Sequence, residues 1–330
     1  MEIYKILILC GMAAALNGCL DSKQSATPET VTFNSPALYP EGVEWDEANQ
    51  RYLVTSIRKG EVGSVKDDGT YWVFARDKRM VSSVGIKIDA KRDRVLVCNA
   101  DPGAAEKSSP KTTGKLAALA TFSLSSGKLI NYTDLAKGIE GGHFCNDLTI
   151  DKDGTAYITD SFSPIIYKVD SNYNASVLVN DKTFGGKSFN LNGIVVKDNY
   201  LLAVKMNSGQ LFKIPLDNPK AFSEVKLEQK IYGADGLSWG PYGSLLVIAN
   251  NNAYVGATPP TATNKVIKLN THDNWATATV TGQSNTGDVF ATTGTTRNGQ
   301  FYVIHAMLHV LFNPETKKQL EQFKIVKYKP

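Results

Sequence analysis

Residues 146–160 read NDLTIDKDGTAYITD, and this stretch decides the fold. A polar pair opens it, an alternating strand follows, Asp and Gly residues reverse the chain at 151–154, and a second strand covers 156–160. A third strand follows at 165–169. Short strands between Gly, Asn and Asp turns, without a long stretch of helical periodicity, predict an all-β protein.

The same pattern, in which a polar residue or pair is followed by strands that turns separate, occurs six times with a period of roughly 45 residues. This period is typical of four-stranded propeller blades, which cannot bury both apolar faces unless neighbours stack. We therefore predict a six-bladed β-propeller, a single domain over residues 31–330. The last repeat is expected to contain strands at 300–304 and 309–312. The six copies begin at Glu41-Gly42, Val84-Gly85, Asn146-Asp147, Asn192-Gly193, Asp235-Gly236 and residues 290–293.

Closure of the ring requires a strand from one terminus to complete a blade begun by the other. Segments 31–33 and 318–328 are the candidates for this pairing. Two insertions, 100–115 and 251–263, are rich in Pro, Ser, Thr and Gly. We expect them to form loops over one rim, where they are candidate lids.

The first residues differ from the rest of the chain. An apolar run at 6–16 follows Lys5, is too short to span a bilayer, and is typical of a signal peptide. It ends in Leu-Asn-Gly-Cys at 16–19, which resembles the bacterial lipobox. We predict a lipoprotein signal peptide at 1–18, lipidation of Cys19 and a flexible tether at 19–30. The alternative is an ordinary signal peptide. The lipoprotein reading places the protein in the bacterial cell envelope, periplasmic or surface-facing.

The composition, 42% hydrophobic and 21% charged, is that of a globular protein with material for a large core. The formal charge of +4 is small and basic residues are not clustered, so nothing indicates nucleic-acid binding. We expect a small-molecule substrate, membrane contact through the lipid alone, and a monomer. Cys98 and Cys145 remain in the mature domain, either as a disulfide or as buried free thiols.

The innermost strand of each propeller blade lines the central tunnel, so residues at equivalent strand starts converge on the axis. Alignment of the copies places Glu41, Asn146, Asn192 and Asp235 there. Two carboxylates and two amides supply only hard oxygen ligands with a formal charge of about −2, which suits Ca²⁺ or another divalent cation. Zinc would require His or Cys ligands. The alternative is that Asn-Gly and Asp-Gly form turns and that Glu41 is a surface charge.

Four segments in order, PEGVEW (40–45), CND (145–147), LNGI (191–194) and ADGL (234–237), resemble the regucalcin/gluconolactonase (senescence marker protein) family. Its relatives are the calcium-dependent propellers diisopropylfluorophosphatase and paraoxonase. The resemblance covers about residues 38–312. It implies that Glu41, Asn192 and Asp235 hold the metal and that Asn146 is a further ligand or a substrate contact. It also implies hydrolysis of a lactone, ester or phosphoester, with Asp235 as base or nucleophile.

The chain also departs from this pattern. Gluconolactonase-like members carry Arg where this chain has Phe144, which removes the expected contact to sugar hydroxyls. Asp147 either supports the metal site and substrate or is a strand-facing polar group. His143, near the tunnel mouth, either assists substrate binding or is structural, and His305 and His309 are expected to pack in the last blade's strands. The competing function is a non-catalytic propeller with a structural metal that binds a ligand or partner; a strictosidine synthase-like enzyme is a further alternative.

Overall fold

The computed structural model describes residues 27–251, 253, 261–313, 315 and 319–330. The predicted signal peptide, Cys19 and most of the predicted tether lie outside these residues. Within the described part of the chain, no helix is both long enough and apolar enough to cross a bilayer.

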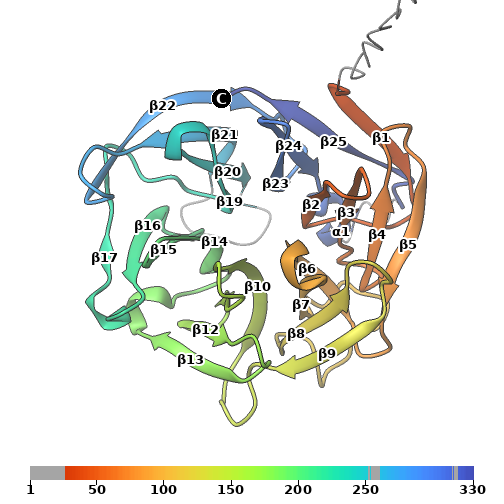
Figure 1. The fold of residues 1–330 in the computed structure, drawn as a ribbon, viewed down its shortest axis with the longest axis horizontal. Helices are drawn as coiled ribbons and strands as arrows, with labels where there is room; N and C mark the ends of the chain where they lie inside the picture. Colours follow the sequence, from red (N-terminus) through yellow and green to blue (C-terminus); the bar gives the residue numbers. More distant parts are fainter. Residues whose placement is uncertain (1–26, 252, 254–260, 314, 316–318) are drawn as a thin grey trace, which may run out of the picture.

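The strands form antiparallel sets of four that follow one another in sequence and surround a central axis (Figure 1). This arrangement confirms the predicted all-β propeller of four-stranded sheets. The sets, from the inner to the outer strand, are β2 (Val43–Asp46), β3 (Arg51–Val54), β4 (Glu61–Val65) and β5 (Tyr71–Arg76); β6 (Ser82–Asp89), β7 (Arg94–Ala100), β8 (Lys115–Ser123) and β9 (Leu129–Asp134); β10 (His143–Ile150), β11 (Ala156–Asp160), β12 (Ile165–Val169) and β13 (Ala175–Asn180); β14 (Leu191–Lys197), β15 (Tyr200–Lys205), β16 (Gln210–Pro215) and β17 (Ser223–Glu224); β19 (Ala234–Trp239), β20 (Leu245–Asn251), β21 (Ala262–Asn270) and β22 (Thr277–Asn285); and β23 (Ala291–Arg297), β24 (Gln300–His305), β25 (Gln322–Tyr328) and β1 (Thr30–Asn34).

Hydrogen bonds divide these strands into five sheets rather than six, because two neighbouring sets merge. The eight-stranded sheet contains β6–β9 and β10–β13, joined by parallel pairing of β10 with β8 at His143↔Lys115 and Phe144↔Leu116. A two-residue strand, β18 (Lys226–Leu227), adds to the outer edge of β22.

The two terminal strands close the ring as predicted. Strand β1 pairs antiparallel with β25, with Val31 opposite Ile325, and β25 pairs with β24 (Figure 1). The last and first sheets are also joined by Arg297, whose guanidinium donates to both carboxylate oxygens of Asp67 and lies 3.8 Å from the ring centroid of Trp45. Both ends of the chain therefore contribute to one closed array.

One predicted strand is wrong. Residues 309–312 lie in the helix α1 (Leu308–Phe312), so His309 is not in a strand. Met307 adopts a left-handed backbone conformation (φ 56°), which ends the extended chain after β24. The third strand of this sheet is instead β25. The short 3₁₀ helices are η1 (Ala90–Arg92), η2 (Lys182–Phe184), η3 (Pro219–Ala221) and η4 (Pro241–Gly243).

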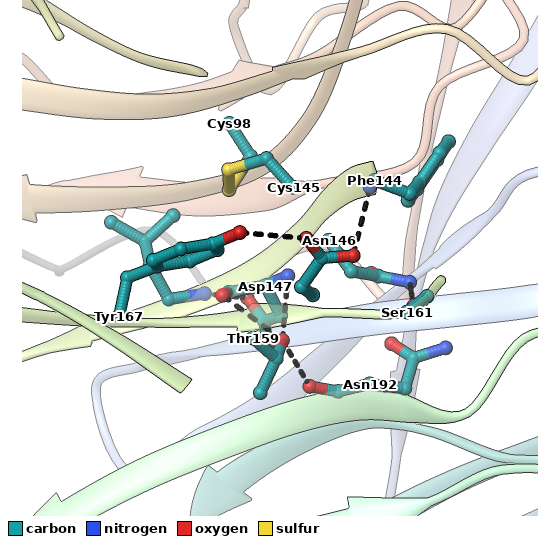
Figure 2. The surroundings of a disulfide bond; sticks show 11 residues. Cys98, Phe144, Cys145, Asn146, Asp147, Thr159, Ser161, Tyr167 and Asn192 are labelled. Carbon is teal, nitrogen blue, oxygen red and sulfur yellow. Dashed lines mark hydrogen bonds between the residues drawn. A yellow bond between two sulfur atoms is a disulfide. The ribbon is translucent and has the colours of Figure 1, made fainter. Parts of the chain in front are cut away.

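The two cysteines form a disulfide, which decides between the two alternatives for Cys98 and Cys145. The bond joins β7 to β10, in the two merged sets, and its Cα atoms are 5.3 Å apart. Figure 2 shows it immediately beside the inner strand that carries Asn146. Both residues are fully buried, so the bond is part of the core.

Candidate metal centre

Five of the six inner strands are irregular at the positions aligned from the sequence, and β2 is the exception. The register shifts in β6, β10, β14, β19 and β23, each time across two residues. A bulge of this kind frees the residues from the ladder and re-aims a side chain. The Asn-Gly and Asp-Gly dipeptides are therefore bulges rather than hairpin turns. The bulged pairs are Val84-Gly85, Asn146-Asp147, Asn192-Gly193, Asp235-Gly236 and Thr292-Thr293.

The second residue of each pair lies against the next inner strand. A Cβ on Gly236 would lie 2.6 Å from the carbonyl oxygen of Thr292, too close for any side chain. Where this residue is not Gly, its side chain bonds across the gap: the Asp147 carboxylate accepts from the backbone N–H of Ile194, at 3.3 Å, and Thr293 donates to the carbonyl of Glu41. These close approaches bring the first residues of the pairs together near the axis.

Glu41, Asn146, Asn192 and Asp235 line one cavity, which encloses about 40 Å³ of free space. Their exposed fractions are only 3–4%. The equivalent positions of the other two inner strands are occupied by Val84 and Thr292, which line the same cavity. Side chains from six separate strand starts thus converge, as the tunnel geometry predicts.

Each of the four predicted ligands has a buried oxygen without a hydrogen-bond partner: Glu41 Oε2, Asn146 Oδ1, Asn192 Oδ1 and Asp235 Oδ1. Buried polar atoms without a partner are uncommon in proteins because desolvation is then uncompensated. Four of them around one cavity are the donors that a hard cation requires.

In three of these side chains, those of Asn146, Asn192 and Asp235, the second polar atom is held by a neighbour. The Asn146 amide donates to Ser161 Oγ at 2.7 Å (Figure 2), and the Asn192 amide donates to Met206 Sδ at 3.5 Å. Asp235 Oδ2 accepts from the Asn250 amide at 2.6 Å. These bonds leave the single oxygen of each amide and Oδ1 of Asp235 without a protein partner. Such supporting contacts are typical of metal sites.

The carboxylates are electrostatically costly in the absence of a cation. Burial raises the pKa of Glu41 well above its usual value, and the charges of Asp235 and Asp147 raise it further. Burial also raises the pKa of Asp235, against the hydrogen bond from Asn250. A divalent cation would stabilise both ionised forms, so the oxygen set and its charge fit Ca²⁺. In the described chain, no three or more His, Cys, Asp or Glu side chains cluster as metal ligands, because two of the four donors are Asn.

Asp147 does not line the cavity but supports its floor. Its carboxylate accepts from the backbone N–H of Leu148, at 2.8 Å, and of Ile194. Burial raises the pKa of Asp147 to about 6, and the nearby ammonium of Lys87, which is paired with Glu44, opposes this shift. These contacts link β10 to the backbone of β14, and both alternatives for Asp147 stay predictions.

The histidines make structural contacts. His143 is 2% exposed, and its Nδ1 lies 2.8 Å from Asp160 Oδ2 while its Nε2 lies 3.2 Å from the carbonyl oxygen of Ile139. Both ring nitrogens are thus occupied by protein oxygens, which fits the structural alternative. His305 bonds to the hydroxyl of Tyr328 between neighbouring strands.

An apolar wall above the four oxygens was not foreseen from the sequence, apart from Phe144. We use the name apolar wall for the nonpolar residues lining the cavity: Ile57, Val84, Pro102, Phe144, Phe189, Met206, Phe290, Leu308 and Phe312. The only sequence signal was that most of them lie at or within a few residues of the start of an inner strand or the end of a second strand. The predicted insertion 100–115 supplies Pro102 and is held in place by Asp101, which accepts from Thr112 at 2.7 Å. Most of the insertion 251–263 lies outside the described residues.

No protein-family model matches this chain, and no curated protein matches its sequence. Solved structures do match. The Malassezia sympodialis allergen Mala s 1 superposes with a TM-score of 0.69 at 14% identity, covering 92% of this chain and 96% of the allergen. A gluconolactonase from Xanthomonas campestris gives 0.58 at 13% identity, over 91% and 89% of the two chains. Regucalcin from Agrobacterium tumefaciens, described as a calcium-binding protein, gives 0.56 at 16% identity, over 89% and 92%.

The chain shares its propeller fold with solved structures that include a gluconolactonase and regucalcin. This likeness agrees with the resemblance seen in the four sequence segments. At such identities it concerns the fold alone, and the activity has to be argued from the site.

Proposed function

We propose that this SMP-30/gluconolactonase-like propeller is a calcium-dependent hydrolase of lactones or related esters or phosphoesters. The observation that carries the proposal is the set of four buried, unpartnered oxygens around one cavity. The gluconolactonase and regucalcin neighbours support it at the level of the fold. Counting the merged sheet as two blades gives the six-bladed ring that we propose.

Glu41, Asn146, Asn192 and Asp235 would hold the cation. When bound, the cation would polarise the carbonyl or phosphoryl oxygen of the substrate. Asp235 would take the proton of the attacking water, because its carboxylate lines the cavity in which that water would stand. As the bond to the leaving oxygen breaks, that oxygen receives the proton. In the nucleophilic version, the Asp235 carboxylate would attack the substrate and displace the leaving oxygen, and water would then hydrolyse the resulting covalent enzyme intermediate to restore the carboxylate.

The experiment is a panel of lactones, aryl esters and phosphotriesters assayed with and without calcium. We expect hydrolysis that is lost with a chelator, restored by Ca²⁺ and reduced by about 100-fold or more in Asp235→Asn. The exposed Asp217 provides a matched control, and Asp217→Asn should keep full activity. Hydrolysis that persists after complete metal removal would contradict the proposal.

The second candidate is a non-catalytic propeller that binds calcium for structure. The small volume of the cavity favours it, because about 40 Å³ holds an ion and a few waters more readily than a substrate. A melting temperature that rises with Ca²⁺, without turnover of any substrate in the panel, would favour this function.

We also propose that the mature protein is a monomeric lipoprotein of the bacterial cell envelope, anchored through Cys19 and facing the periplasm or the surface. The support is the lipobox-like segment at 16–19. Cys19→Ser should release the protein in soluble form. Membrane association that survives this substitution would refute the anchor.

A further inference from the structure

The apolar wall surrounds the predicted metal ligands at one end of the ring. Phe144 and Phe290 precede the inner-strand ligand positions by two residues, while Ile57 and Met206 follow the second strands β3 and β15. Starts of inner strands and ends of second strands lie on the same rim of a propeller, so these residues face the same opening. The cavity thus combines a floor of oxygens with sides of hydrocarbon.

The aromatic part of the wall is rigid before any ligand arrives. The rings of Phe144, Phe162 and Phe189 pack against one another, with centroids 5.0–5.2 Å apart. Asp160 Oδ1 accepts from the backbone N–H groups of both Phe144 and Phe162, at 2.9 Å each. This network fixes where the two chain segments lie, so the wall is prebuilt.

The sides of the cavity offer a ligand few hydrogen bonds. Apart from the four predicted metal ligands, the polar side chain among the described lining residues is Thr292, and its hydroxyl already donates to the Glu41 carbonyl at 2.6 Å. A hydroxyl group of a ligand placed against this wall would lose its water without gaining a partner.

We propose that the substrate is a lactone or ester with an apolar chain, and not a polyhydroxylated sugar lactone. This inference rests on the proposed function and specifies its substrate class. The carbonyl oxygen faces the floor of four oxygens, where the cation would be held. The first methylenes of the chain displace water from Phe189, Leu308 and Phe312, and a longer chain extends through the opening of the cavity, whose free space is about 40 Å³. Each buried methylene contributes a factor of roughly four to transition-state binding where the contact is complete.

The test is kcat/KM, at saturating Ca²⁺, for γ-lactones from γ-butyrolactone to γ-octalactone and for glucono-1,5-lactone. We expect kcat/KM to rise several-fold for each of the first methylenes, and glucono-1,5-lactone to be at least about 100-fold poorer than γ-octalactone. Phe189→Gln should flatten the dependence on chain length, whereas the apolar Phe189→Leu retains a slope. Phe222, which packs on Phe184 away from the cavity, supplies the control Phe222→Gln, in which the slope is kept.

The outcomes separate this inference from the proposed function. Faster hydrolysis of glucono-1,5-lactone than of γ-octalactone overturns the inference and leaves the hydrolase intact. If nothing is hydrolysed, the hydrolase fails, and calorimetry decides the inference with two product-like probes. Sodium octanoate should bind the calcium-supplemented protein at least about tenfold more tightly than sodium gluconate. Tighter binding of gluconate, or no difference between the probes, overturns it.

Discussion

At the scale of single residues, the site depends on which end of each amide faces the cavity. An Asn side chain can present either its oxygen or its NH₂ group, and only the oxygen can bind a cation. Ser161 settles this for Asn146, because its hydroxyl accepts from the amide (Figure 2). The same hydroxyl donates its own proton to the carbonyl of Leu191, at 2.5 Å. A residue that touches no metal therefore helps to set the donor geometry.

Ser161→Ala should weaken calcium binding by about 10- to 100-fold, because the Asn146 amide loses its acceptor and can turn. Isothermal titration calorimetry with Ca²⁺ would measure the change. Ser176 is exposed on β13, and Ser176→Ala should leave the affinity unchanged. An unaltered affinity in Ser161→Ala would show that the amide is oriented without Ser161.

The pair of His143 and Asp160 predicts a pH-dependent stability. The hydrogen bond that the protonated His143 donates to the Asp160 carboxylate raises the pKa of His143 above its ordinary 6.5, although burial opposes the shift. Stabilisation by the charged pair is therefore fully present below about pH 6.5 and is lost as the pH rises through the folded-state pKa.

Replacement of the histidine tests this sign. In His143→Gln, the melting temperature should fall most near pH 6, and the difference from the wild type should shrink toward pH 9. Thermal unfolding at fixed ionic strength across this range would measure it. A difference that grows with pH would mean that the histidine is neutral in the folded protein.

At the scale of elements, each inner strand must approach its neighbour closely to bring the ligands to the axis. In each bulge, the first residue directs its side chain toward the axis. The second residue lies against the neighbouring inner strand and allows the two strands to approach closely. The disulfide between β7 and β10 adds a covalent tie directly next to the bulge of Asn146. The ligand positions are therefore set by contacts between strands rather than within them.

Gly236→Ala should disturb this contact, since its Cβ would lie 2.6 Å from the carbonyl oxygen of Thr292. We expect a destabilisation of roughly 1–3 kcal/mol and weaker calcium binding, measured by chemical unfolding and calorimetry. At Gly185 the nearest atom to an added Cβ is 3.4 Å away, so Gly185→Ala should be close to neutral. Equal behaviour of the two variants would argue against the close-approach explanation.

At the scale of the whole molecule, the ring is stable only when it is closed. Strand β1 pairs with the edge of β25, and the β1 side chains of Val31 and Phe33 are buried. The ion pair of Lys327 with Glu29 and the contact of Arg297 with Asp67 add further ties at this junction. The propeller therefore needs residues from both termini for its last sheet.

Deletion of residues 1–34 should lower the melting temperature markedly and promote aggregation, because it exposes the edge of β25. Deletion of residues 1–26 removes only chain that precedes the described structure and should leave unfolding unchanged. Differential scanning calorimetry and size-exclusion chromatography would distinguish the two. A stable, monomeric protein without β1 would show that closure is dispensable.

The amino-acid sequence by itself determined the repeat, the strand-rich blades, the closing segments and the four candidate ligands, because these follow from local periodicity and from aligned positions. Only the tertiary structure decided the pairing of Cys98 with Cys145, the conversion of 309–312 from strand to helix, the bulges and the apolar wall. These features depend on distances between segments far apart in the chain. Strand pairing, Cβ separation and the direction of a side chain relative to a neighbouring sheet have no local signature, so they emerge only when the ring is assembled.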